Sequence, residues 1–268
     1  MPELPEVETV VRGLTRHIVG QSIKNIKILN KKSFYGTSRP QYHAVRGAAR
    51  LGNNLKIKKI ARRGKAVIIT LSKGLSLLIH LKMTGQLIYV PKSVRHSGEL
   101  TKRLQNRMNR SIRSWTSQDD GKGKRLNLGH PTKDFVEEMP SSHTRVIFEL
   151  SKGTLYFNDQ RKFGWVKLVP TKNVEKDKFI SKLGVEPLSK AFTPEVLWQA
   201  IQRHPNSPIK STITDQSLIT GVGNIYSDEA LFVAGIRPDR KGKTITKPET
   251  KKLAAAIKKV LELGIKHA

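Results

Sequence analysis

The chain has 268 residues, 37% of them hydrophobic, and a formal net charge of +29 from 50 Lys and Arg against 21 Asp and Glu. This excess favours a polyanionic partner held through phosphate contacts, with nucleic acid preferred over a membrane. The sequence contains no cysteine, which excludes disulfides and thiolate metal sites, and it shows neither a spanning apolar stretch nor a signal peptide. We expect a cytoplasmic protein large enough for two packed domains or a single large one.

The first two-thirds of the chain predicts one helix followed by many strands. Pro5 suits the first turn of a helix, and apolar residues from Val7 to Ile18 recur at helical spacing, which predicts a helix over residues 5–18. Short β-like runs separated by turn residues follow, a rhythm typical of a β-sandwich. The expected strands cover residues 22–29, 55–61, 65–71, 75–81, 86–90, 144–149, 153–158 and 164–169.

The last third of the chain predicts helices. Residues 171–190 are polar and interrupted by proline, whereas a helical pattern begins at Pro194 and ends in an amphipathic helix over 247–264. The sequence therefore predicts an α+β protein. Its expected parts are a β-sandwich domain with an opening helix over residues 1–171, a linker over 172–190 and a helical domain over 191–268.

Residues 91–133 form a basic insert between two of the expected strands. They hold eleven Lys and Arg against three Asp and Glu, few aliphatic residues, and a polar, glycine-containing run over 117–123. This composition predicts a loosely ordered loop. Two interpretations are open, a solvated loop with no task or an auxiliary contact to DNA.

The strongest chemical signal is the start of the chain, Met1-Pro2-Glu3-Leu4-Pro5-Glu6. Methionine before a residue such as proline is normally removed, which would leave the secondary amine of Pro2 free. An α-amine has a pKa of about 8 against about 10.4 for lysine, so far more of it is a neutral nucleophile at pH 7. Its attack on a sugar C1′ gives a cationic iminium, which favours loss of the neighbouring phosphates by elimination. The residues alone leave another interpretation open, because Glu3 and Glu6 are also ordinary first-turn carboxylates.

The opening PELPEVETVVRGL resembles the N-terminus of the formamidopyrimidine-DNA glycosylases, relatives of endonuclease VIII, and further segments match that family in order. The resemblance spans residues 1–90 and 143–266, and Leu4 with the Glu-Val-Glu after Pro5 favours the formamidopyrimidine branch. The further segments are Arg62-Arg63-Gly64-Lys65, His80-Leu81-Lys82-Met83-Thr84-Gly85, Phe157-Asn158-Asp159-Gln160-Arg161-Lys162-Phe163-Gly164, Leu183-Gly184-Val185-Glu186-Pro187-Leu188 and Thr220-Gly221-Val222-Gly223-Asn224-Ile225-Tyr226.

The resemblance implies a base-excision-repair enzyme that removes oxidised purines, such as formamidopyrimidine and 8-oxoguanine, and nicks the abasic site by β/δ-elimination. Pro2 resembles the family's Schiff-base nucleophile, and Glu3 resembles the acid that protonates the opened sugar. Lys65 resembles a lysine that contacts phosphate and donates a proton during elimination, with a plain surface lysine as the alternative. Glu6 is expected to hold the N-terminus or the extruded base, or else to be only a helix-start carboxylate.

The resemblance also implies a DNA-binding surface. Extruding a base leaves a hole in the duplex, and Met83, Arg161 and Phe163 resemble the wedge residues that fill it. For Phe163, burial in the core is the alternative. His143 resembles a phosphate-binding histidine, and its alternative role is to end a strand.

Residues 209–235 resemble the family's helix-two-turn-helix. A helix opening at Asn224 is expected to grip phosphate with its free N–H groups. Lys210 is expected to be a second phosphate contact, while Asn206 stands where many relatives carry lysine. Relatives continue into a four-cysteine zinc finger that these 268 residues lack, so we expect no metal or other cofactor within this chain.

The expected partner is damaged double-stranded DNA, bound by a monomer that associates with the nucleoid and not with a membrane. Two other classes stay open. A noncatalytic binder of damaged DNA would keep the charge and the wedge, and borohydride trapping on abasic DNA separates it from an imine-forming enzyme. An RNA-binding protein also fits the charge but has no use for the Pro2-Glu3 start or the wedge motifs.

Overall fold

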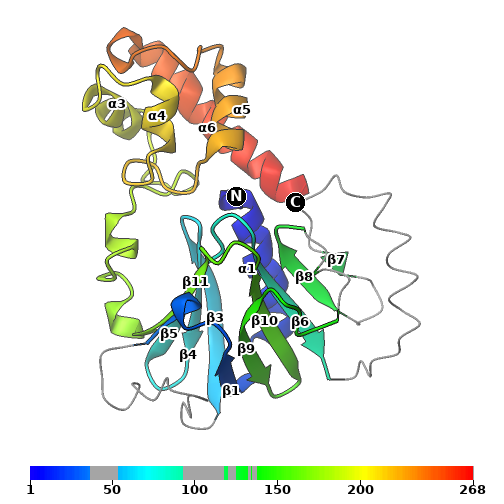
Figure 1. Ribbon diagram of the computed structural model, residues 1–268. Coiled ribbons are helices and arrows are strands. Elements are labelled where there is room, and N and C mark those ends of the chain that lie inside the picture. Colours follow the sequence, from blue (N-terminus) through cyan, green and yellow to red (C-terminus); the bar gives the residue numbers. More distant parts are fainter. Residues whose placement is uncertain (37–53, 93–117, 120–124, 132–133, 135–137, 268) are drawn as a thin grey trace, which may run out of the picture.

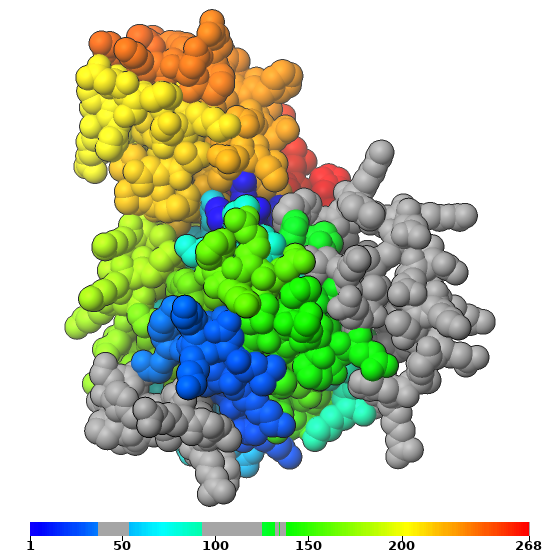
Figure 2. Space-filling view, viewed as in Figure 1, coloured from blue at the N-terminus to red at the C-terminus, as the bar shows by residue number. Residues whose placement is uncertain are grey.

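The computed structural model of the chain describes residues 1–36, 54–92, 118–119, 125–131, 134 and 138–267. A strand-rich part and a helical part lie one above the other, and the first helix, α1, lies along the strand-rich part with its N-terminus at the junction (Figure 1). The dark-blue N-terminal residues reach the surface at this waist (Figure 2). The start of the chain is therefore placed between the two parts.

Helix α1 (Leu4–Ile18) forms because Pro5 occupies its first turn and apolar residues follow at helical spacing. Val7, Val10 and Leu14 are buried in the core of the strand-rich part. Leu4 instead belongs to the core of the helical part. One helix thus joins two hydrophobic cores, and each fully buried Leu or Val side chain contributes roughly 1.5–3 kcal/mol to holding it there.

The strands follow one another in a single hydrogen-bonded order, β2-β11-β5-β4-β3-β1-β9-β10-β6-β8-β7. The described pairings are antiparallel except for β2 with β11. Both halves of this order contribute to the core that α1 covers. The strands are β1 (Ser22–Ile28), β2 (Phe34–Tyr35), β3 (Leu55–Arg63), β4 (Ala66–Leu71), β5 (Leu75–His80), β6 (Gly85–Pro91), β7 (Gln118–Asp119), β8 (Leu126–Gly129), β9 (Thr144–Leu150), β10 (Gly153–Asp159) and β11 (Trp165–Pro170).

The helical part contains the longer helices that follow the strands. They are α3 (Pro194–Gln202), α4 (Ile209–Thr214), α5 (Asn224–Ala234) and α6 (Lys247–His267). Short 3-10 turns also occur, η1 (Lys31–Ser33) before β2, η4 (Thr171–Asn173) and η5 (Ile180–Lys182) between the two parts, and η6 (Gly242–Thr244) before α6. Helix α6 packs on α5 and also contacts α1, which adds a second connection between the helical part and the N-terminus.

The expected α+β class, with a β-sandwich, an opening helix and a helical domain after it, is confirmed. Two local expectations are wrong. Leu126–Gly129, inside the expected loose insert, forms strand β8, because Leu126 and Leu128 are buried in the core beside α1. Lys65 lies in a turn one residue before β4, although a strand was expected to include it. Most of the insert, 93–117, 120–124 and 132–133, lies outside the described residues.

Part of the segment that was expected to be a linker packs against the sheet, and this part includes η5. Val174 and Ile180 are buried with Leu78 and Val169 in a separate small core. No helix among the described residues is long and apolar enough to cross a membrane.

Candidate active site at the junction of the two parts

The Glu3 side chain is buried, and its carboxylate is held by the start of α5. Oε2 accepts a hydrogen bond from the backbone N–H of Gly223 at 2.7 Å and Oε1 accepts one from Ile225 at 2.9 Å, while Tyr226 N–H lies 3.4 Å from Oε2. A Cβ added at Gly223 would lie only 2.4 Å from the Glu3 carboxyl carbon. Glycine at this position therefore makes room for the carboxylate against the backbone.

This geometry corrects the expectation that the free N–H groups at the start of α5 grip phosphate. Three of these groups, at Gly223, Ile225 and Tyr226, donate to Glu3. A helix N-terminus favours any anion, and here a carboxylate from the other end of the chain occupies it. The Asn224 side chain is exposed at the first position of α5.

Glu3 and Lys65 share a desolvated environment. Burial raises the pKa of the Glu3 carboxyl, and the opposing effects of the backbone N–H groups and of Lys65 do not cancel this increase. Burial likewise lowers the pKa of the Lys65 amine, against the attraction of Glu3 and Glu6. Both shifts move the pKa values toward neutrality, where a group can donate a proton and take it back.

Lys65 occupies the two-residue turn between β3 and β4, in which Arg63 pairs with Ala66. Gly64 has a positive φ of 56°, so the turn needs glycine before Lys65. A Cβ on Gly64 would also lie 2.2 Å from Thr220 Oγ1. This hairpin therefore packs directly against the helical part and presents Lys65 at the junction.

Glu186 holds the same turn from the other side. Its carboxylate accepts hydrogen bonds from the Gly64 N–H at 2.6 Å, from Arg62 at 2.8 Å and from Arg63 at 3.1 Å. Arg63 also donates to the carbonyls of Leu183 and Gly184. The segment around Glu186 is thus fastened to the backbone that carries Lys65.

Glu6 is buried and bonded at both carboxylate oxygens. Oε2 accepts the Glu3 backbone N–H at 2.7 Å, and Oε1 accepts the Tyr226 hydroxyl at 2.8 Å. Burial and the neighbouring Glu6 charge raise the pKa of Tyr226, so its hydroxyl stays protonated as the donor. Glu6 therefore connects the N-terminal turn of α1 to α5.

Pro2 is buried beside Glu3, whereas Met1 is exposed. The backbone N–H of Leu4 donates to the Gly221 carbonyl at 3.0 Å, so the chain just after Pro2 is anchored to the helical part. Gln216 supports this anchor by accepting from the Gly221 N–H and donating to the Val222 carbonyl. Removal of Met1 would leave the amine on Pro2, the residue directly before Glu3.

Two loops that carry the expected wedge residues lie side by side because of strand pairing. Residues 81–84 connect β5 to β6, and residues 160–164 connect β10 to β11. Strand β5 pairs with β11, and β6 pairs with β10. Each loop therefore runs from one of these strand pairs to the other. The resemblance placed the wedge residues in separate motifs, and the sheet brings those motifs together.

The side chains expected to form the wedge are solvent-accessible. Met83 is 39% exposed and Phe163 is 57% exposed, which removes burial in the core as an explanation for Phe163. The Arg161 guanidinium lies 5.1 Å from the centre of the Phe163 ring. These loops therefore display apolar and cationic groups at the surface. Proteins that kink DNA insert apolar side chains between base steps and place arginine in the minor groove.

Two of the expected phosphate contacts, His143 and Lys210, already have acidic partners. His143 Nδ1 lies 3.1 Å from both carboxylate oxygens of Asp134, and Lys210 lies 2.7 Å from Asp228. Asn206, which stands where many relatives carry a lysine, is exposed. The acidic partners were not anticipated from the sequence.

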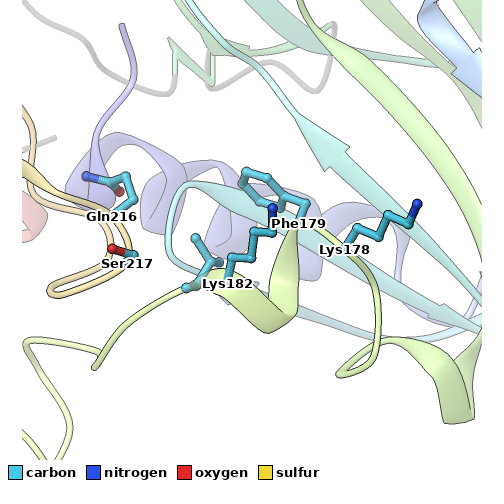
Figure 3. A pocket seen from close by; sticks show the side chains of 6 residues that line it. Lys178, Phe179, Lys182, Gln216 and Ser217 are labelled. Atoms are coloured by element: carbon cyan, nitrogen blue, oxygen red, sulfur yellow. The ribbon is translucent and has the colours of Figure 1, made fainter.

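An open pocket of 460 Å³ lies beside the junction. Figure 3 shows Lys178, Phe179 and Lys182 on one side of it and Gln216 and Ser217 on the other. None of the expected catalytic or DNA-binding residues lines it.

Among the described residues, no group of three or more His, Asp or Glu side chains could hold a metal ion. The four-cysteine zinc finger of relatives does not fit these 268 residues, because they contain no cysteine.

Several site residues were missed from the sequence. Asp159, Glu186 and Tyr226 were each within a matching segment but were given no role. The signal that could have found them is a polar residue inside an otherwise apolar or glycine-rich motif, which requires a partner when buried.

Comparison with known proteins supports one family over most of the chain. The family model of the formamidopyrimidine-DNA glycosylase N-terminal domain matches residues 1–166, and that of the formamidopyrimidine-DNA glycosylase H2TH domain matches residues 183–268. A formamidopyrimidine-DNA glycosylase of Pelotomaculum thermopropionicum is 36% identical over 268 residues, covering 100% of this chain and 79% of the relative. One from Desulfitobacterium hafniense is 35% identical over 266 residues, covering 99% and 78%.

Solved structures of Lactococcus lactis Fpg share the fold. Its complex with DNA that contains an abasic site has a TM-score of 0.72 and 25% identity, covering 98% of this chain and 78% of that one. Its complex with DNA that contains an oxidized pyrimidine also has a TM-score of 0.72 and 25% identity, covering 99% and 80%. The chain therefore belongs to the formamidopyrimidine-DNA glycosylase family, a family of DNA glycosylases and abasic-site lyases.

Proposed function

We propose that this chain removes oxidised purines, including formamidopyrimidine and 8-oxoguanine, from double-stranded DNA and nicks the resulting abasic site by β/δ-elimination. The observation that carries the proposal is the burial of Glu3, the residue after Pro2, and of Lys65. The two side chains interact electrostatically, and burial shifts the pKa of each. Family membership supports a damaged-base substrate. The complexes of Lactococcus lactis Fpg with abasic-site DNA and with DNA that contains an oxidized pyrimidine support binding of damaged DNA.

In the proposed reaction, the Pro2 amine, freed by removal of Met1, attacks C1′ of the damaged nucleotide. The bond from C1′ to the base breaks, and the base departs with the proton that the attacking amine loses. Glu3 in its protonated form then donates its proton to the ring oxygen as the C1′–O4′ bond breaks. The raised pKa of Glu3 keeps more of the acid form available at neutral pH. The product is an open-chain sugar joined to Pro2 as an iminium.

The iminium then acts as an electron sink for elimination. Loss of a C2′ proton breaks the C3′–O bond and releases one phosphate, and a second elimination breaks the C5′–O bond. In this proposal Lys65 contacts a phosphate and supplies a proton during these steps. Its lowered pKa makes the protonated and neutral forms easier to interconvert than in free lysine.

For DNA binding, we propose that Met83, Arg161 and Phe163 fill the space left by the extruded nucleotide. Extrusion costs a few kcal/mol of stacking, which inserted side chains partly restore. His143, Lys210 and the exposed side chain of Asn224 are proposed phosphate contacts. For His143 and Lys210, binding would exchange a carboxylate partner for phosphate.

A noncatalytic damaged-DNA binder is the alternative. The free-energy cost of burying Glu3 and Lys65 at the junction argues against it. Burying charged groups costs several kcal/mol each even after relaxation, and a binder gains nothing from placing Glu3 and Lys65 in such an environment. An 8-oxoguanine duplex whose damaged strand is labelled at both its 5′ and its 3′ end provides the test. We expect a nicked product whose ends carry phosphate on both sides of the gap, whereas retarded migration without nicking would favour the binder.

A further inference from the structure

Asp159 lies at the base of both loops that carry the proposed wedge residues. It is the last residue of β10 and is paired in register with Gly85, the first residue of β6. Its side chain is completely buried. A buried carboxylate at a strand end requires several hydrogen-bond donors, and here these come from both loops.

The first loop donates through Thr84, whose hydroxyl bonds to Asp159 Oδ1. The second loop donates through the backbone N–H of Arg161 to Oδ1 at 3.2 Å and through that of Gly164 to Oδ2 at 2.6 Å. The Arg161 N–H also lies 3.1 Å from the Thr84 hydroxyl oxygen. One carboxylate therefore connects the residue after Met83 to residues on both sides of Phe163.

Both loops contain a strained residue that this connection helps to maintain. Lys82 has φ of 54° and Lys162 has φ of 61°, a conformation that non-glycine residues rarely adopt. The Lys82 N–H also donates to His80 Nδ1 at 3.0 Å. Strain of this kind persists only where surrounding contacts fix the backbone, and it is found mainly at functional sites.

The backbone of Asp159 extends the connection to a third proposed DNA contact. Its N–H donates to the His143 carbonyl at 2.9 Å, and its carbonyl accepts the buried Arg145 side chain at 2.8 Å. Arg145 also donates to the Ser142 carbonyl. The same residue thus fixes the two wedge loops relative to the strand that begins after His143.

We infer that Asp159 and Thr84 are positioning residues that couple the Met83 loop to the Arg161 and Phe163 loop, so that both enter the DNA as one preformed unit. The inference rests on the proposed function. Neither residue is assigned a contact with DNA. Without the coupling, each loop would have to be ordered separately during insertion, which lowers the population of the inserted state.

The test compares T84V, which removes the hydroxyl at nearly constant volume, with T84S, which keeps it. T171V is a matched control, because the Thr171 hydroxyl bonds to Ser76 at 2.9 Å away from these loops. Two readouts are measured, the fluorescence of 2-aminopurine placed beside an abasic-site analogue in a duplex, and borohydride trapping on single-stranded abasic DNA. The fluorescence reports insertion of the loops into the duplex. Trapping requires imine formation, and on single-stranded DNA it needs no insertion because there is no duplex gap to fill.

We expect T84V to reduce the rate of the fluorescence change about tenfold, the effect of losing one hydrogen bond of about 1.4 kcal/mol. T84S and T171V should stay within about twofold of the unmodified protein, and trapping by all three should be unchanged. D159N, which replaces one acceptor with a donor facing N–H groups, should have a larger effect on insertion than T84V. In a double-mutant cycle, T84V and F163A should be non-additive.

The inference is overturned if the fluorescence change with T84V and with D159N is as fast as with the unmodified protein. It is also overturned if T84V lowers the rates of insertion and of trapping equally. An additive cycle would also contradict coupling between the loops. Absence of trapping in the unmodified protein would count against the proposed function instead. If that protein still gives a normal insertion signal, the insertion rates of T84V and T84S decide whether the loops are coupled.

Discussion

The backbone N–H of Gly64 donates to Glu186 at 2.6 Å, and this bond fixes the turn in which Lys65 is the next residue. Arg62 and Arg63 bind the same carboxylate with their guanidinium groups. Glu186 belongs to the segment between the sheet and α3. Its contacts therefore make the position of Lys65 depend on the docking of the two parts of the protein.

The first prediction concerns E186Q. The amide keeps the shape of the side chain but removes the charge that two arginines and an N–H group share, which should cost about 1–3 kcal/mol of stability. Displacement of Lys65 should slow strand nicking at a preformed abasic site about tenfold, while borohydride trapping through Pro2 changes little. Single-turnover nicking and trapping on one duplex measure both effects. E175Q, at an exposed position, is the control, and equal losses in both assays would contradict the assignment to Lys65.

The second prediction concerns G223A. A Cβ at this position would lie 2.4–2.8 Å from the Glu3 carboxyl atoms, closer than real Cβ atoms approach other atoms. The Glu3 carboxylate must then shift, so proton donation to the opened sugar should be impaired and trapped adduct should form at least about tenfold more slowly. A thermal melt of the same variant reports whether the fold is retained. A folded G223A protein that traps at the normal rate would show that the Glu3 position does not matter.

Much of the fold follows from local pattern in the sequence. Helix α1 and strands such as β9 and β10 begin and end within about two residues of the expected positions, because apolar periodicity and turn residues are local signals. Strand β8 was missed because it contains only two apolar residues, Leu126 and Leu128, which alternate with a polar one in a basic, polar context. Its burial depends on α1, which is distant in the sequence.

The contacts within the site were much less predictable. The Pro2-Glu3 start and Lys65 were identified through the family resemblance, but the partner of the Glu3 carboxylate is the start of α5, more than two hundred residues away. The expectation that phosphate occupies those N–H groups was reasonable from the helix dipole alone and wrong because an intramolecular carboxylate takes the position. Asp159 was similarly overlooked, since its role depends on two loops that only the sheet brings together.

The third prediction concerns stability in acid. Burial lowers the pKa of His80 from 6.5 to about 3, so the folded protein binds fewer protons than the unfolded chain between these values. Stability should therefore fall as the pH drops below about 6.5, by roughly 2–3 kcal/mol at pH 4.5 from this residue. Urea unfolding at pH 7 and pH 4.5 should show a smaller loss in H80N, whose side chain does not titrate. Equal losses in the two proteins would exclude His80 as the cause.

The fourth prediction concerns salt. With a net charge of +29, the protein should bind duplex DNA largely through phosphate contacts that release counterions. If about six phosphates are neutralised, affinity should fall about a thousandfold between 50 and 200 mM salt. Fluorescence anisotropy with an abasic-analogue duplex measures the slope of log affinity against log salt. A flat response would mean that the charge serves another purpose.

The most direct test of the central claim is to locate the covalent bond formed with abasic DNA. The protein is incubated with an abasic duplex and borohydride, digested, and analysed by mass spectrometry alongside the intact mass of the untreated chain. We predict that the untreated chain lacks Met1 and that the reduced sugar is attached to the nitrogen of Pro2. A chain that retains Met1 yet traps DNA, or an adduct on Lys65 or another lysine, would contradict the proposed mechanism.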